Sequence, residues 1–272
     1  MNHLKQISIQ LRQQLIVAHS RAKHSHIGTS FSCLDILVAL YYEILKIDPR
    51  NPKYEKRDRF ILSKGHGASA FYATLASKKL IPQEWMDHYQ ENGSRLSGHP
   101  DRLSVPFVEI SAGSLGHGLP IGLGMAFALR LDENLARVFV LMSDGEIQEG
   151  TTWESANNAA RLKLDNLTAI VDANKLQSYE KTDNIMPIKS FRAKWEAFGW
   201  AVREVDGHNF EEIVPALKAV PFEKGKPSII IAHTIKGKGI QDFENELAYH
   251  YWPPREEHVE RYLKELESTG GS

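Results

Sequence analysis

The sequence RVFVLMSDGEIQEG at residues 137–150 begins as a short apolar run and then reaches an Asp-Gly pair. A second run of the same kind, NLTAIVDANKL at residues 166–176, leads into Asn174. Near-continuous apolar runs of this length are typical of strands in a parallel sheet that is covered on both faces. The two runs therefore predict buried strands whose carboxyl ends carry Asp144 and Asn174.

Three further apolar runs extend this sheet, namely RFIL at 59–62, AVREV at 201–205 and SIIIAHT at 228–234. Segments with helical periodicity alternate with the strands, at 69–79, 119–131, 152–162 and 191–198. This alternation predicts an α/β fold, in which a parallel sheet carries helices on both faces. Ligands of such sheets bind beyond the carboxyl ends of the strands, so the functional residues are expected there.

The two ends of the chain are also predicted to be helical. Apolar residues at spacings of three and four indicate a helix over 4–19, and LDILVALYYEIL indicates a more deeply buried helix over 34–45. The histidine-rich HSHIGTS at 24–30 falls between these helices, so its histidines are expected in a loop. Near the C-terminus, HVERYLKELE at 258–267 predicts a charged helix and ESTGGS at 267–272 predicts a flexible end.

Length and composition narrow the class of protein. The 272 residues contain no repeat, low-complexity tract or interdomain linker, so a single domain over 1–272 with a C-terminal extension from about 250 is expected. Lys and Arg number 33 and Asp and Glu 34, which leaves a net charge of −1. Such a balance supplies no basic field for nucleic acid, so a nucleic-acid partner is not expected.

Membrane and redox environment follow from two further features. The longest apolar stretch, Ile121 to Leu129, is broken only by glycines and reaches about half of the roughly 20 residues that a membrane span needs. No membrane partner is therefore expected. Cys33 is the only cysteine, which excludes an intramolecular disulfide and favours a reducing, cytosolic location.

The strand ends suggest a site for a metal diphosphate. Asp144 offers a carboxylate, Asn174 an amide oxygen and Leu176 a peptide carbonyl, and such hard oxygen donors suit a divalent cation. Gly145 has no Cβ, so a diphosphate could approach the backbone closely there. By themselves, however, an Asp-Gly pair after a strand more often marks a turn, and Asn174 more often caps a helix.

Further sequence blocks give these residues a context. They are SHIG at 25–28, LSKGHGASAFYA at 62–73, GHP at 98–100, GSLGHGLPIGLGMA at 113–126 and SDGEIQEGTTWESA at 143–156, followed by the Asn174 segment. Thirty residues separate Asp144 from Asn174. In these blocks, their order and this spacing, almost the whole chain resembles the N-terminal half of transketolase.

The resemblance implies the diphosphate-binding (PP-type) domain of a thiamine-diphosphate enzyme. It implies that Asp144, the Asn174 side chain and the Leu176 carbonyl ligate Mg²⁺ or Ca²⁺. The cofactor-binding residues that it implies are His66, Gly113, Ser114, Leu115, Gly145, Glu146, Asn174 and His250. The activity implied is ketol transfer, in which a two-carbon unit passes from a ketose to an aldose.

The resemblance also implies catalytic residues, which are His26, His66, His99, His250 and Glu149. The histidines would line the channel to the thiazolium, where neutral imidazoles bind hydroxyls and exchange protons near neutral pH. A loop histidine beside glycine is by itself more often a surface or structural residue. Glu149 and Glu154 would lie at a dimer interface on a proton path between two cofactors, although either would also complement a helix N-terminus.

The late histidine is the least well matched of these positions. ELAYHYWPP fits the transketolase segment around His250 only loosely, because Tyr251 replaces a small residue or histidine. His233, in AHTIKGKG, competes for the same role, and His250 is preferred.

The glycine-rich block at 113–124 has a second interpretation. Its glycines do not form G-x-G-x-x-G and no strong strand precedes it, so a nicotinamide cofactor is disfavoured. Gly122 and Gly124 are expected only to let the helix that follows pack closely against a neighbour.

A complete transketolase continues with a pyrimidine-binding domain that carries the activating glutamate, and no candidate for this residue remains in the sequence. The resemblance therefore implies a split enzyme, in which a C-terminal subunit supplies that domain and an α2β2 assembly acts on sugars or sugar phosphates. The alternatives are a subunit like deoxyxylulose-phosphate synthase or 2-oxo acid dehydrogenase, and a non-catalytic cofactor-binding paralogue.

Overall fold

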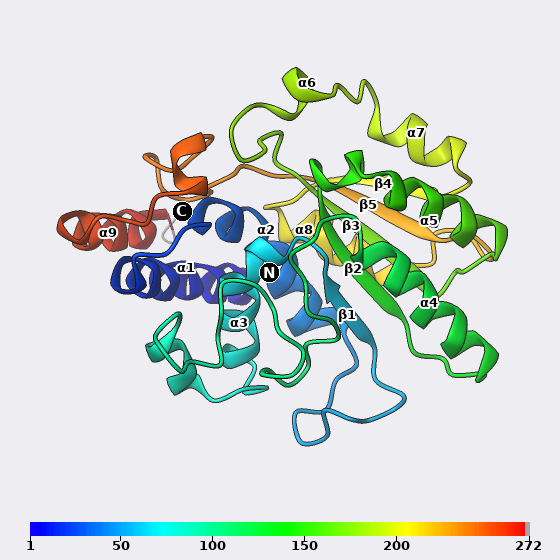
Figure 1. Ribbon diagram of the computed structural model, residues 1–272, viewed down its shortest axis with the longest axis horizontal. Helices are drawn as coiled ribbons and strands as arrows, with labels where there is room; N and C mark the ends of the chain where they lie inside the picture. Colours follow the sequence, from blue (N-terminus) through cyan, green and yellow to red (C-terminus); the bar gives the residue numbers. More distant parts are fainter. Residues whose placement is uncertain (270–272) are drawn as a thin grey trace.

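The computed structural model describes residues 1–269 and has an α/β architecture (Figure 1). Within these residues, five parallel strands form one sheet in the order β1-β2-β3-β5-β4. The strands are β1 (Arg59–Leu62), β2 (Val138–Ser143), β3 (Leu167–Ala173), β4 (Ala201–Asp206) and β5 (Ser228–His233). The predicted fold class is confirmed, and each of the five predicted strands is present close to its expected bounds.

The strand register brings the carboxyl ends of the central strands together. Every residue of β2 and β3 is buried, as their near-continuous apolar sequences predict. Ser143 pairs with Asp172, and Ala173 pairs with His233. Because parallel neighbours end at the same edge of a sheet, the residues that follow β2, β3 and β5 gather there.

Helices cover both faces of the sheet (Figure 1). The α-helices of the described residues are α1 (Asn2–Ala22), α2 (Ile27–Ala39), α3 (Ala68–Ser77), α4 (Gly118–Leu131), α5 (Gly150–Arg161), α6 (Thr182–Ile185), α7 (Phe191–Ala197), α8 (Phe210–Lys218) and α9 (Val259–Thr269), and of these α9 packs on α1 rather than on the sheet. Buried residues of α1, α2, α3 and α8 belong to the same hydrophobic cluster as Phe139 and Leu141 of β2, whereas those of α4, α5 and α7 belong to a second cluster with Val138 and Val140. Alternate residues of a strand point to opposite faces, which explains this division.

Helix α2 begins seven residues before the predicted start, at Ile27. His26 is its N-cap residue, with a φ of 74°, so only the first part of the histidine-rich segment is a loop. The helix continues through a π-helical turn, Leu40–Ile44. Small and polar residues such as Thr29 and Ser30 suggest a loop in the sequence, but here they are buried, and tertiary packing overrides their weak local preference.

Residues 27–44 are, among the described residues, the one helical stretch that is long and apolar enough to cross a membrane. Their burial accounts for that composition, since 89% of the stretch is buried inside the protein. At the C-terminus, α9 reaches Thr269, so the predicted flexible end is wrong for 267–269. The remainder of that prediction, 270–272, lies outside the described residues.

Gly122 and Gly124 of α4 differ in their surroundings. A Cβ on Gly122 would lie 2.6 Å from Cγ2 of Val140, so this glycine permits close contact between α4 and β2. A Cβ on Gly124 would meet no atom within 4 Å outside its own helix. The prediction of close packing is confirmed for Gly122 and wrong for Gly124, which lies on the exposed face of the helix.

Candidate active site

A cavity of about 370 Å³ lies at the carboxyl ends of β1, β2, β3 and β5. Most of the predicted site residues line it, and these are His26, His66, His99, Gly113, Leu115, Asp144, Gly145, Glu149, Asn174, Leu176 and His250. Ser114 and Glu146 are not among the lining residues. Segments that are far apart in the sequence therefore contribute to one site.

Asp144 follows β2 directly and is almost completely buried. Its Oδ1 accepts a hydrogen bond from the Gly145 amide at 2.8 Å, and its Oδ2 accepts one from the Lys175 amide at 2.5 Å. Burial and the neighbouring Asp172 carboxylate raise the pKa of Asp144 to about 6. A cation in the cavity would favour the ionised form, which is the form that ligates metals.

Asn174 follows β3 and is held by groups behind the cavity. Its Nδ2 donates to Ser32 Oγ at 3.2 Å and to Asp172 Oδ2 at 3.4 Å. Its Oδ1 accepts from the Leu176 amide at 3.0 Å and, with two lone pairs, retains the capacity to accept a further interaction. The hydrogen bonds thus direct the nitrogen away from the site and leave the oxygen as a candidate ligand.

The donor set of the cavity fits a magnesium or calcium ion. Asp144, Asn174 and the carbonyl of Leu176 supply oxygen, which these hard cations prefer. Within residues 1–269, no group of three or more His, Cys, Asp or Glu side chains is arranged to hold a metal. Side-chain atoms of Gln177 would lie 3.1 Å from a Cβ on Gly145, so this side chain packs against the glycine expected to face a diphosphate.

The four predicted histidines form one cluster at the cavity. The ring centroid of His26 lies 4.9 Å from that of His250, 5.7 Å from that of His99 and 5.8 Å from that of His66. The His26 amide also donates to the His250 carbonyl at 3.0 Å. The fold therefore brings together imidazoles from four separate places in the sequence, namely the N-cap of α2 and the segments that carry His66, His99 and His250.

Burial keeps the cluster neutral near pH 7. Desolvation, reinforced by the neighbouring His250, lowers the pKa of His26 to about 3. Desolvation also lowers the pKa of His250 to about 4, with a further contribution from the Lys236 ammonium, and holds the pKa of His66 well below its ordinary value. Neutral imidazoles can both accept and donate hydrogen bonds, as a sugar-binding site requires.

His233 and His250 occupy different places. His233 ends β5, is exposed, and its Nε2 lies 2.8 Å from Oε2 of Glu204. His250 lines the cavity with His26 and His66. Of these two histidines, His250 is the one that lies at the candidate site, and its role as the late histidine stays a prediction.

The three glutamates after Asp144 also differ. Glu146 is fully buried, and its carboxylate accepts hydrogen bonds from the amides of Gly116 at 2.9 Å and Ser143 at 3.2 Å, and from the Ser63 hydroxyl. It therefore holds the glycine-rich segment in place. Glu149 lines the cavity and is exposed, and Glu154 is exposed on α5.

Lys236 lines the cavity, and the sequence patterns did not single it out. The residue is 1% exposed, and its Nζ donates to the carbonyls of Gln177 at 2.8 Å and Leu176 at 3.5 Å. The same Nζ lies 3.2 Å from Nδ1 of His250. Burial and the charge of Lys64 lower the pKa of Lys236 to about 8. The position of Lys236 shortly after β5 is the sequence signal that could have identified it.

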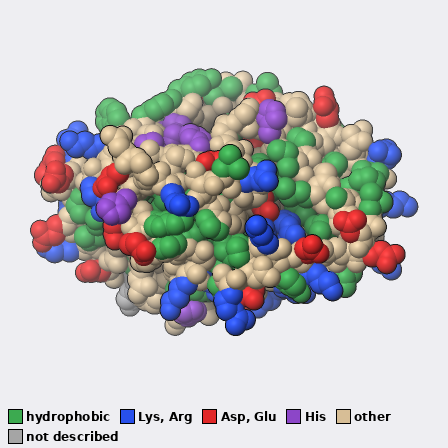
Figure 2. Space-filling view, turned by 60° about the horizontal axis from the view of Figure 1, so that its bottom comes forward, with side chains coloured by type: hydrophobic (Ala, Val, Ile, Leu, Met, Phe, Trp, Pro, Cys, Tyr) green, Lys and Arg blue, Asp and Glu red, His purple; other side chains and the backbone are tan. Residues whose placement is uncertain are grey.

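The surface agrees with the balanced composition. Figure 2 shows Lys and Arg side chains interspersed with Asp and Glu over the face in view, without a large patch of one sign. The cavity at the strand ends, which is lined by polar groups from several segments, is a feature typical of small-ligand sites.

Comparison with known proteins shows the family of the chain. Over residues 5–268 the chain matches the family described as "Transketolase, thiamine diphosphate binding domain". It is 42% identical over 255 residues to an apulose-4-phosphate transketolase subunit of Phocaeicola vulgatus, a match that covers 94% of this chain and 90% of that protein. It is also 42% identical over 245 residues to a 6-deoxy-6-sulfo-D-fructose transketolase subunit of Clostridium sp., covering 90% of this chain and 89% of that protein.

Solved structures agree with these sequence relationships. The crystal structure of transketolase from Campylobacter jejuni superposes with a TM-score of 0.90 at 29% sequence identity. The match covers 100% of this chain and 43% of the Campylobacter chain, so this chain spans less than half the length of that transketolase. From its sequence match and its fold, the chain belongs to the family of transketolase thiamine diphosphate-binding domains.

Proposed function

We propose that the chain is the N-terminal subunit of a split transketolase, which moves a two-carbon ketol unit from a ketose donor to an aldose acceptor. The observation that carries this proposal is one cavity that combines the oxygen donors of Asp144, Asn174 and Leu176 with a cluster of neutral histidines. Relatives that are named as single subunits of a transketolase support it, because the match covers 90% and 93% of their own length.

The metal-binding role rests on the three oxygen donors. Asp144, the Asn174 amide and the Leu176 carbonyl would hold Mg²⁺ or Ca²⁺ and leave coordination positions for diphosphate oxygens. The Lys236 ammonium adds positive charge to the same wall of the cavity. When bound, thiamine diphosphate supplies the electron sink that stabilises a carbanion after carbon–carbon cleavage.

The histidines would bind the sugar hydroxyls and move protons. Because Lys236 Nζ can donate only, its contact with Nδ1 of His250 leaves the proton of that ring on Nε2. Nε2 of His250 can therefore donate a hydrogen bond to a substrate oxygen. His26, His66 and His99 surround the same space and, since they are neutral, can each accept a hydrogen bond from a substrate hydroxyl as well as donate one.

We infer that a separate C-terminal subunit supplies the pyrimidine-binding domain, in an α2β2 assembly. The exposed Glu149 and Glu154 are accessible to such a partner. Apulose-4-phosphate and 6-deoxy-6-sulfo-D-fructose appear in the names of two relatives, and we propose a sugar or sugar phosphate as the substrate of this chain as well.

The decisive experiment compares the chain alone with the chain mixed with the product of the adjacent gene. Thiamine diphosphate binding is measured by calorimetry with and without Mg²⁺, and ketol transfer is measured with a panel of ketose donors. We expect the chain to bind the cofactor in a metal-dependent way. We expect turnover only in the mixture. Full turnover by the chain alone would contradict the split site, and metal-dependent binding without turnover in the mixture would indicate a non-catalytic paralogue.

A further inference from the structure

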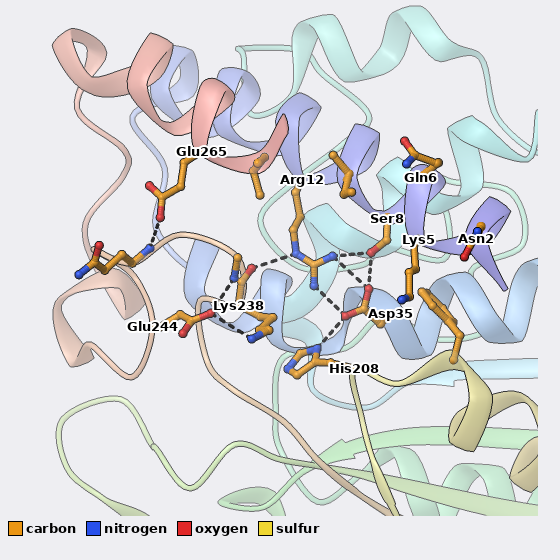
Figure 3. A pocket seen from close by; sticks show the side chains of 15 residues that line it. Asn2, Lys5, Gln6, Ser8, Arg12, Asp35, His208, Lys238, Glu244 and Glu265 are labelled. Atoms are coloured by element: carbon orange, nitrogen blue, oxygen red, sulfur yellow. Dashed lines mark hydrogen bonds and ion pairs between the residues drawn. The ribbon is translucent and has the colours of Figure 1, made fainter. Parts of the chain in front are cut away.

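A second cavity, of about 700 Å³, lies between α1, the segment 238–244 and α9 (Figure 3). A buried group of side chains, named here the Arg12 cluster, forms part of its wall and consists of Ser8, Arg12, Asp35 and His208. Arg12 forms a bidentate ion pair with Asp35, at 2.8 Å from Nη2 to Oδ2 and 3.0 Å from Nη1 to Oδ1. Ser8 hydrogen-bonds to both partners, as Figure 3 shows.

His208 extends the cluster in a fixed orientation. Its Nδ1 lies 2.7 Å from Oδ2 of Asp35, and its Nε2 accepts a hydrogen bond from the Ile235 amide at 2.8 Å. Because an amide nitrogen can only donate, Nε2 must be unprotonated and Nδ1 carries the proton that is donated to Asp35. The carboxylate therefore sets the tautomer that accepts from Ile235.

The cluster and α2 together hold the turn that follows β5, residues 235–239, at three points. His208 binds the amide of Ile235, the Gly28 carbonyl accepts from the Gly237 amide at 2.9 Å, and Arg12 Nε donates to the Lys238 carbonyl at 3.0 Å. Gly237 has a φ of 81°, and a Cβ there would lie 2.2 Å from the carbonyl oxygen of Phe243. The turn is thus confined on several sides.

The same turn carries Lys236 into the catalytic cavity. Its Nζ reaches the Gln177 and Leu176 carbonyls and His250 Nδ1. The side chains of Arg12 and Asp35 do not line that cavity, since each is 5% exposed and faces the second one. Within residues 1–269 the side chains of the Arg12 cluster thus lie outside the catalytic cavity and connect to it through the 235–239 turn and through α2, which carries Asp35 and accepts a hydrogen bond from Arg12 at the Phe31 carbonyl.

We propose that His208 is a positioning residue for cofactor binding, which acts with Arg12 and Asp35 by fixing the 235–239 turn and hence the Lys236 ammonium. This inference rests on the proposed function, because it assigns Lys236 to the cofactor site. A buried ion pair by itself gives little net stability relative to apolar residues of similar volume, so its presence fits a role in defining local geometry. At metal sites, loss of a residue that orients a ligand through a hydrogen bond typically costs about 10- to 100-fold in metal affinity or activity, and we take the lower end as the scale for Lys236.

Two substitutions distinguish the roles of the two ring nitrogens of His208. In His208→Asn the amide nitrogen can replace Nδ1 and donate to Asp35, but nothing accepts from Ile235. In His208→Gln the amide oxygen can replace Nε2 and accept from Ile235. We expect His208→Asn to weaken thiamine diphosphate binding roughly 10-fold in the presence of Mg²⁺, and His208→Gln to retain most of the affinity.

Hydrogen exchange of the cofactor-free protein tests the positioning directly. The amides of 235–239 should exchange faster in His208→Asn than in the unsubstituted chain, and at the original rate in His208→Gln. Because no cofactor is present, this readout remains decisive even if the unsubstituted chain fails to bind thiamine diphosphate, which would refute the proposed function instead. Unchanged exchange in His208→Asn overturns the positioning role.

A double-mutant cycle with Lys236→Met tests the route of the effect. If His208 acts through Lys236, His208→Asn should cost much less affinity in the Lys236→Met background than in the unsubstituted chain. The same loss in both backgrounds overturns the inference. His88→Asn, at an exposed histidine paired with Glu91, is the matched control and should leave cofactor affinity and exchange of 235–239 unchanged.

Discussion

Lys64 and Asp172 form an ion pair in which neither side chain is exposed to solvent. Burial alone would raise the pKa of Asp172, but the Lys64 ammonium and the hydrogen bonds from Ser32 and Thr234 together outweigh that effect and hold the pKa below its ordinary value. The same carboxylate accepts from Ser32, Thr234 and the amide of Asn174. The candidate metal ligand therefore depends on a buried charge pair behind it.

Asp172→Asn should lower the free energy of unfolding by about 3–5 kcal/mol, because it leaves the Lys64 charge buried without a partner. Urea unfolding measures this change. The double variant Lys64→Met/Asp172→Asn buries no charge and should be more stable than the sum of the two single changes predicts. Simple additivity would show that the pair is not energetically coupled.

Asp144→Ala should abolish detectable Mg²⁺-dependent binding of thiamine diphosphate while the chain remains folded. The substitution removes the one carboxylate among the three proposed metal ligands and also a desolvated charge. Calorimetry with and without Mg²⁺ measures binding, and circular dichroism checks the fold. Retained metal-dependent affinity would contradict the ligand assignment.

Stability should fall between pH 7 and pH 5 because of buried neutral histidines, of which His19 is the clearest. Its Nε2 lies 2.8 Å from the Ser69 hydroxyl, and burial lowers its pKa to about 4, against 6.5 when unfolded. As the pH falls, the unfolded chain takes up a proton at His19 before the folded chain does. The contribution of neutral His19 to the free energy of unfolding is therefore complete above pH 6.5 and is lost as the pH falls toward 4. At pH 5 the loss from this residue alone is about 2 kcal/mol.

His19→Gln should reduce that pH dependence, because Gln does not titrate. Urea unfolding at pH 8, 7 and 5 gives the comparison, with pH 8 as the reference at which His19 is neutral in both states. Part of the slope should remain, since His26 and His250 shift in the same direction. An unchanged slope would mean that His19 does not titrate as its burial implies.

Gly122→Ala and Gly124→Ala should change stability in opposite directions. The added methyl group at Gly122 must displace the Val140 side chain, which typically costs about 1–3 kcal/mol. At Gly124 the methyl group meets open space, and alanine in a helix should gain about 0.5–1 kcal/mol. Urea unfolding of both variants is the measurement, and destabilisation by Gly124→Ala would indicate a contact that the structure lacks.

The sequence predicted the sheet well because its strands are strongly patterned. The runs ending at Leu62, Met142 and Val171 are short and apolar, and their shortness, their β-branched residues and the polar or glycine-containing segments after them favour strands over buried helices. The start of α2 at Ile27 was missed because histidine, glycine and small polar residues there carry no helical signal. Their helix forms through burial against α1 and α3, which local propensity does not encode.

The site was predictable where a residue follows a strand, and less so elsewhere. Asp144 and Asn174 stand directly after β2 and β3, so their proximity follows from a parallel sheet. Lys236 follows β5, whose pairing with β3 joins distant segments, and a lysine among glycines reads as a solvent-facing residue. Glu146 was expected at the cofactor, and only the structure reveals its hydrogen bonds to Ser63 and Gly116.

The burial of Cys33 has a practical consequence. The side chain has no exposed surface, and its burial in α2 raises the pKa of the thiol to about 12. At neutral pH it is therefore unreactive toward alkylating reagents. A cysteine introduced at a fully accessible position such as Leu135 would be the sole labelling site, so a fluorophore could report association with a partner without prior removal of the native thiol.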